Sequence, residues 1–130
     1  MRLLLVCLGG AFGSGARYLV ALALARPATL QFPWATLAVN VLGCFCLQLL
    51  LGLAAGGLRV SDEMRLLLAT GVLGGFTTYS SFNAETLALW RAGAPRLALI
   101  YLVATVLVCL AAGLAGAALA RSLAPVPQPS

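Results

Sequence analysis

The sequence contains no histidine and only three acidic residues. Two of these acids, Asp62 and Glu63, are neighbours in a short polar stretch, and the third is Glu85. Such a chain lacks the usual partners for general acid–base catalysis and for nucleophilic triads. We therefore expect that it is not an enzyme.

Lysine is also absent, so the net charge of +5 comes from arginines. They lie near the ends of apolar stretches, where basic side chains suit anionic lipid headgroups. The sequence has no basic face with interleaved aromatic residues of the kind that nucleic-acid binding needs. We expect the lipid bilayer, and not nucleic acid, to be the partner of these charges.

Cysteine is scarce and poorly spaced for binding a metal. Cys7, Cys44, Cys46 and Cys109 all lie inside apolar stretches and form no C-x-x-C motif. No histidine is present to join them in a zinc-type site. We interpret all four as small buried hydrophobic residues.

Charge of either sign is rare, because charged residues make up 8% of the chain and hydrophobic residues 62%. Soluble domains are about 25% charged, so this chain is expected to be an integral membrane protein. Four stretches, at about residues 3–25, 34–58, 66–90 and 97–120, approach the roughly 20 residues that a membrane-spanning helix needs. We predict an all-α protein with one four-helix transmembrane domain at residues 1–124 and a proline-rich tail at residues 125–130. The first stretch is too long for a typical signal peptide, so it is expected to remain as a helix.

The third apolar stretch is interrupted by polar residues. Between Gly71 and Glu85 it contains paired glycines, clustered threonines and serines, and aromatic residues. Glycine and hydroxylated side chains weaken a helical ladder and offer its backbone other partners. Broken backbone at membrane depth is tolerated only where protein buries it or where it lines a polar cavity. We expect this helix to be broken and to carry an ion or substrate site.

The first stretch combines small residues with a deep arginine. Gly9 and Gly13 are four residues apart, which indicates a close helix-packing face. Arg17 lies too far into the stretch for snorkelling alone to explain it. Two interpretations remain open: Arg17 caps helix carbonyls or pairs with Glu85, or its charge attracts anions in an aqueous vestibule.

Polar side chains recur at one-turn spacing on the second and fourth stretches. Thr36 and Asn40 share one helix face, and so do Tyr101 and Thr105, with Cys109 one turn further on. An isolated Asn in a membrane helix usually supplies an interhelical hydrogen bond. Beside Thr36 and a broken third helix, a pore-lining role for Asn40 is favoured.

Three motifs resemble the Fluc, or CrcB-like, family of small fluoride channels. They are G-G-x-x-G-x-x-x-R-Y at residues 9–18, T-L-x-V-N-x-x-G at 36–43 and G-G-x-T-T-Y-S-x-F at 74–82. Their order over a four-helix chain is specific, and the resemblance covers essentially all four helices. It implies a fluoride-selective channel that passively exports fluoride across the cell membrane and so lowers cytoplasmic fluoride. It also implies an antiparallel homodimer of dual topology, two fluoride pathways and a structural Na⁺ ion at the dimer interface.

The resemblance also assigns roles to individual residues. Asn40 would supply the pore amide, and Tyr79 and Phe82 the two pore aromatics, although Phe is the commoner residue in the position of Tyr79. Backbone carbonyls of Gly74 and Thr77 would hold the sodium ion. The polar track beside the pore would comprise Thr36, Ser81, Glu85, Tyr101 and Thr105, with Cys109 where a serine can extend it and Arg17 in the vestibule.

Two other functions fit the sequence less well. A small four-helix multidrug exporter would be expected to carry a membrane-embedded carboxylate in its first helix, which here has Arg17 and no acid. A purely structural membrane subunit would explain the glycines. It would not explain Asn40 together with the cluster at residues 77–82.

The arginines are divided almost evenly between the two sides of the expected bundle. If the helices cross in turn, one side carries Arg2, Arg59, Arg65 and Arg121, and the other carries Arg26, Arg91 and Arg96. Orientation follows the Lys/Arg bias of short loops. We therefore predict that single chains insert both ways and pair antiparallel, through an interface that is the same on both subunits.

Overall fold

The computed structural model describes residues 1–25 and 32–123, which are helical apart from short connectors and contain no strand. The elements in chain order are α1 (Arg2–Ala23), α2 (Trp34–Ala55), α3 (Asp62–Arg65), the π-helix η1 (Leu66–Leu73), α4 (Gly74–Phe76), α5 (Tyr79–Arg91) and α6 (Pro95–Leu123). The prediction of an all-α protein is confirmed. The proposed tail at residues 125–130 and Arg26 lie outside the described residues.

Three of the helices, α1, α2 and α6, are long and apolar enough to cross a membrane. They correspond to the predicted stretches at residues 3–25, 34–58 and 97–120. The stretch predicted at residues 66–90 is divided among α3, η1, α4 and α5. The chain is therefore a helical membrane protein in which the third apolar stretch is built differently from the other three.

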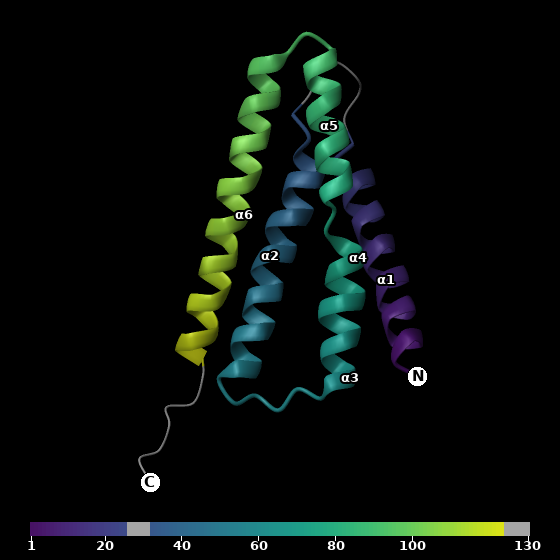
Figure 1. Cartoon of the computed structure of the whole chain (residues 1–130), viewed down its shortest axis with the longest axis vertical. Helices are drawn as coiled ribbons and strands as arrows, with labels where there is room; N and C mark the ends of the chain where they lie inside the picture. The colour runs from purple at the N-terminus through teal and green to yellow at the C-terminus, as the bar shows by residue number, and fades with distance from the viewer. Residues whose placement is uncertain (26–31, 124–130) are drawn as a thin grey trace.

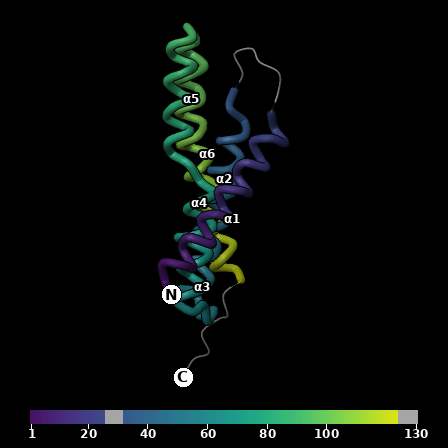
Figure 2. The backbone as a smooth tube through the Cα atoms, turned by 90° about the vertical axis from the view of Figure 1, so that its right-hand side faces the viewer, coloured from purple at the N-terminus to yellow at the C-terminus, as the bar shows by residue number. Residues whose placement is uncertain are grey.

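The helices form an elongated bundle. Helix α2 packs along α6, α1 packs on η1 and α4, and α5 packs on α6. Figure 1 shows the start of α1, the α2–α3 connector and the end of α6 at one end of the bundle, with the α5–α6 connector at the other end. Figure 2, turned by 90°, again shows α5 beside α6. The junction of α4 and α5 therefore lies well inside the bundle, away from both ends.

Glycines allow the close helix contacts of this bundle. A Cβ atom added to Gly9 would lie 2.6 Å from the Leu67 carbonyl oxygen, and one added to Gly13 would overlap the Val72 carbonyl. The predicted packing face of Gly9 and Gly13 is thus confirmed, with η1 as its partner. On the opposite side, Gly116 of α6 meets the Phe45 carbonyl of α2 in the same way.

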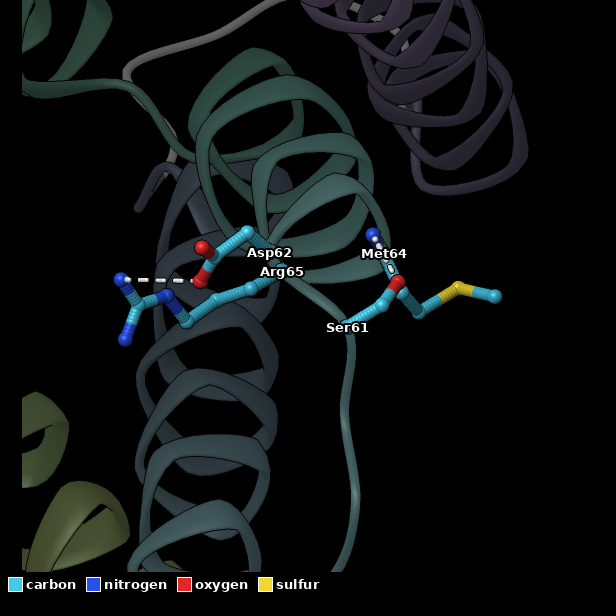
Figure 3. A network of polar contacts seen from close by, with 4 residues as sticks. All are labelled: Ser61, Asp62, Met64 and Arg65. Atoms are coloured by element: carbon cyan, nitrogen blue, oxygen red, sulfur yellow. Dashed lines mark hydrogen bonds and ion pairs between the residues drawn. The ribbon is translucent and has the colours of Figure 1, made fainter.

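Several helix ends differ from the predicted boundaries. Asp62 and Glu63, predicted to lie in a connector, form the first turn of α3, because Ser61 accepts a hydrogen bond from the Met64 N–H at 3.2 Å (Figure 3). This side-chain cap satisfies a free N–H, and acidic residues in a first turn complement the helix dipole. Helix α2 ends at Ala55 and not at residue 58, since Gly57 adopts a positive φ of 101°.

None of the four cysteines is fully buried as predicted. Cys7 and Cys46 are exposed in the single chain, whereas Cys44 and Cys109 are half-buried. A membrane helix can turn apolar side chains outward, because lipid solvates them as well as a protein core does. Apolar surroundings in the sequence therefore indicated a membrane location for Cys7 and Cys46, but not burial inside the bundle.

Candidate functional site

The centre of the site is the two-residue gap between α4 and α5. Helix α4 ends at Phe76, and the next two residues are extended, with φ and ψ of −76° and 155° at Thr77 and −152° and 113° at Thr78. Thr78 caps the helix that follows, because its hydroxyl oxygen accepts a hydrogen bond from the Ser81 N–H at 3.1 Å. The chain thus leaves the helical ladder for two residues and re-enters it with a capped N-terminus.

Asn40 of α2 pairs with the backbone of this gap. Its Nδ2 donates to the Thr78 carbonyl at 3.1 Å, and its Oδ1 accepts from the Thr78 N–H at 2.8 Å. Both Asn40 and Thr78 are buried, where an unpaired peptide group costs about 1–3 kcal/mol. The Asn40 amide therefore replaces the helical partners that Thr78 has lost.

The gap also releases two carbonyls from the ladder. In an uninterrupted helix the Gly74 carbonyl would accept from the N–H of Thr78, and the Thr77 carbonyl from the N–H of Ser81. Those two N–H groups donate instead to the Asn40 side chain and to the Thr78 hydroxyl. Gly74 and Thr77 line the same cavity, so their carbonyls are suited to an oxygen-ligand cation site.

Glu85 of α5 joins helices α2 and α6. The Thr36 hydroxyl donates to its Oε1 at 2.7 Å, and the Tyr101 hydroxyl donates to its Oε2 at 2.7 Å. Thr36 is buried and Tyr101 is completely buried. Short hydrogen bonds to a carboxylate are stronger than neutral ones, so this bridge fixes three of the predicted track residues relative to one another.

Arg17 does not pair with Glu85. Within residues 1–25 and 32–123, the one ion pair joins Arg65 to Asp62, at 3.9 Å on the surface (Figure 3). The interpretation that Arg17 pairs with Glu85 is therefore wrong. The two residues instead line one cavity of about 360 Å³, and the buried Arg17 Nε has no hydrogen-bond partner in the described part of the chain.

Three aromatic rings meet beside the gap. The buried Phe82 ring lies 5.7 Å from the Tyr79 ring and 5.3 Å from the Tyr101 ring, in edge-to-face arrangements. Tyr79 is 79% exposed in the single chain, whereas Phe82 is 7% exposed. Phe82 is therefore held in place by contacts within the chain, and Tyr79 is presented outward.

The predicted site residues other than Tyr101, which is completely buried and lines neither cavity, fall into two cavities that meet at Thr78. One cavity, of about 360 Å³, is lined among others by Asn40, Gly74, Thr77, Tyr79, Phe82 and Thr105. The second is lined among others by Arg17, Thr36, Ser81 and Glu85. Thr78 lines both cavities. Thr78 was not among the residues expected at the site, although the Thr77–Thr78 pair, one residue after two glycines, was the available signal.

A comparison with protein families matches residues 4–117 to the family described as CrcB-like protein, Camphor Resistance (CrcB). Several curated relatives carry the name fluoride-specific ion channel FluC. The protein of Anaeromyxobacter dehalogenans is 54% identical over 95% of this chain and 98% of its own length. Those of Chelativorans sp. and Agrobacterium fabrum are each 50% identical, over 94% and 95% of this chain and 98% of their own lengths. Full-length matches at this identity, together with the family model, show that the chain belongs to the CrcB-like family.

Proposed function

We propose that this protein is a fluoride channel, which lets fluoride leave the cytoplasm passively and thereby lowers its concentration there. The observation that carries the proposal is the junction at Thr78, where a buried amide, an extended backbone and a fixed aromatic ring line one cavity. The names of the relatives support fluoride as the ion. The chain is not an enzyme.

The groups at this cavity suit a small, strongly hydrated anion. Conduction requires donors that replace the water shell without holding the ion too tightly. Asn40 uses one N–H on Thr78 and has a second to offer, since a side-chain amide carries two donor hydrogens. The Thr105 hydroxyl is buried and has no partner within the described residues. These donors are neutral, and the residues that line this cavity include no charged side chain that would trap fluoride.

Phe82 contributes a different kind of contact. The edge of an aromatic ring carries partial positive charge, so a ring turned edge-on attracts an anion weakly. The packing of Phe82 against Tyr101, which is itself hydrogen-bonded to Glu85, fixes the orientation of the ring. We assign Phe82 and Tyr79 to the constriction of the pathway and Thr36, Ser81, Glu85, Tyr101 and Thr105 to its polar side, with Arg17 in the vestibule.

The assembled channel, in this proposal, is an antiparallel homodimer in the cell membrane, with four crossings per chain and the third crossing broken at Thr77 and Thr78. The exposed position of Tyr79 supports a partner subunit on that face. Gly74 and Thr77 of the two subunits would hold a structural sodium ion through their carbonyls, as broken helices do in transporters. The released carbonyls described above are the observation that supports this site.

Insertion in both orientations is tested by tagging the C-terminus with a side-specific reporter. We expect substantial populations on both faces of the membrane, because the arginine difference between the two sides is only one. Adding two or three arginines to either side should lock a single orientation. A unique orientation of the unmodified chain would contradict the antiparallel dimer and its shared sodium site.

Fluoride transport is tested with purified protein in liposomes loaded with potassium fluoride. A fluoride electrode should record efflux as soon as a potassium ionophore relieves the charge that builds up. An exporter would release fluoride only under a proton gradient, and a structural subunit would release none. Empty liposomes with ionophore are the control.

A further inference from the structure

Two of the four cysteines, Cys44 and Cys109, lie on the packed helices α2 and α6 and line the same two cavities. Cys44 lies on α2 one turn after Asn40, and Cys109 lies on α6 one turn after Thr105. The Cys44 carbonyl oxygen is 3.9 Å from the place that a Cβ atom on Gly113 would occupy, one turn beyond Cys109.

Both thiols line the cavity at the Thr78 junction, and both also line the adjoining cavity of about 480 Å³ between α2 and α6. The pair therefore stands where the two cavities meet. Thr105, whose buried hydroxyl has no partner within the described residues, lines the first of these cavities one turn before Cys109. A ligand held between the thiols would therefore lie close to the Thr105 hydroxyl, which forms no hydrogen bond within the described residues.

The number and kind of donors decide which ligand fits. Within the described residues no group of three or more His, Cys, Asp or Glu side chains comes together, so the four ligands of a structural zinc site are not available. Sulfur ligands select soft cations, and Hg²⁺ is satisfied by two thiolates in a line. The resulting complex is neutral, which matters at membrane depth because an isolated charge there is costly.

We propose that Cys44 and Cys109 together form a two-thiol binding site for a soft, two-coordinate metal cation, with Hg²⁺ as its simplest probe. On binding, two S–H bonds break and two S–Hg bonds form, so that two protons leave to water and no electrons are transferred. The occupied site bridges α2 and α6. Because the thiols share the cavity of Asn40 and Phe82, the occupant also obstructs the pathway, a consequence that rests on the proposed channel function.

Binding is tested on the full-length protein in detergent by titration with mercuric chloride, followed by a wash with an excess of a small monothiol. Sulfur-to-mercury charge-transfer absorbance and bound mercury are measured afterwards. The wild type should retain one mercury per chain, because a bridged ion must break two bonds to leave. Cys44→Ser and Cys109→Ser should each lose the retained mercury, with Cys44→Ala and Cys109→Ala as second replacements in case either serine variant does not fold.

The matched control is the double variant Cys7→Ser with Cys46→Ser, which removes the two exposed thiols and should retain mercury like the wild type. Retention of mercury by the Cys44 or Cys109 variants, or loss of it in the control, would overturn the two-thiol site.

The effect on transport is measured separately in liposomes, with each variant compared with its own untreated rate. After the same monothiol wash, which removes mercury held by a single thiol, mercury should lower the fluoride efflux of the wild type and of the control double variant by about tenfold or more, as expected for an obstructed pathway, and should not lower that of Cys109→Ser. Retained mercury with unchanged efflux would overturn the placement of the site in the pathway. Absence of efflux before mercury is added would instead contradict the proposed function, while the detergent titration would still decide the binding site.

Discussion

Replacing Asn40 by Asp changes one NH₂ group into an oxygen at the centre of the site. The variant keeps the acceptor that receives the Thr78 N–H at 2.8 Å but loses the donor that reaches the Thr78 carbonyl at 3.1 Å. Leaving that buried carbonyl unpaired costs about 1–3 kcal/mol. The new carboxylate oxygen also faces the carbonyl oxygen, so the geometry of the gap is disturbed at the residue that lines both cavities.

The larger effect is on the anion itself. Two unit charges about 4 Å apart interact by about 4 kcal/mol at an effective dielectric constant of about 20. Repulsion of that size between the Asp carboxylate and fluoride corresponds to a rate lower by about a thousandfold, since each 1.36 kcal/mol is about a factor of ten. We therefore expect Asn40→Asp to abolish measurable fluoride efflux while the dimer still assembles.

The measurement is liposome efflux together with size-exclusion chromatography of the detergent-solubilised protein. Asn83→Asp is the matched control, because it makes the same chemical change on an exposed face of α5 and should retain transport. Wild-type efflux in Asn40→Asp would refute the role of the Asn40 amide. Equal loss of efflux in Asn40→Asp and Asn83→Asp would show that a carboxylate added at either position stops transport, and would also refute that role.

Three further substitutions probe the surroundings of the gap. Phe82→Ile removes the ring but keeps bulk, so efflux should fall sharply with the dimer intact; an unchanged rate would mean that the ring only packs. Tyr101→Phe removes the hydroxyl that donates to Glu85 at 2.7 Å and should lower stability by about 1–3 kcal/mol in a denaturation assay, whereas no loss would show that the bridge is not stabilising. Gly13→Ala places a methyl group against η1, whereas the methyl group of Gly10→Ala meets no atom within 4 Å. Only Gly13→Ala should therefore impair folding. Equal folding yields of the two variants would contradict the close packing of α1.

The sequence was sufficient for the membrane class and the three long helices, and it grouped Thr36 with Asn40, but it did not single out Thr78. Apolar length and composition predict spans directly, and Thr36 and Asn40 could be grouped because one helical turn separates them. The N-terminal boundary of α3 was missed although its signal was present. Ser61 followed by two acids is typical of a capped helix start, and it was interpreted as a connector.

The remaining features depend on contacts between segments far apart in the chain. The pairing of Asn40 with Thr78 joins residues 38 positions apart, so no local pattern could indicate that this amide completes the backbone of the gap. The same holds for the bridge from Tyr101 to Glu85. The π-helical turn of η1, in which the Gly74 N–H pairs with the Ala69 carbonyl five residues earlier, also has no sequence signature in Leu66–Leu73. It was found only from the backbone geometry.

The central claim is that the protein conducts fluoride passively and selectively. The most direct test uses a planar bilayer that contains the protein and has unequal fluoride concentrations on its two sides. The quantity measured is the reversal potential of the current. The account predicts reversal at the equilibrium potential of fluoride, unchanged when a proton gradient or a chloride gradient is imposed. A reversal potential that shifts with the proton gradient, or that follows chloride instead of fluoride, would contradict it.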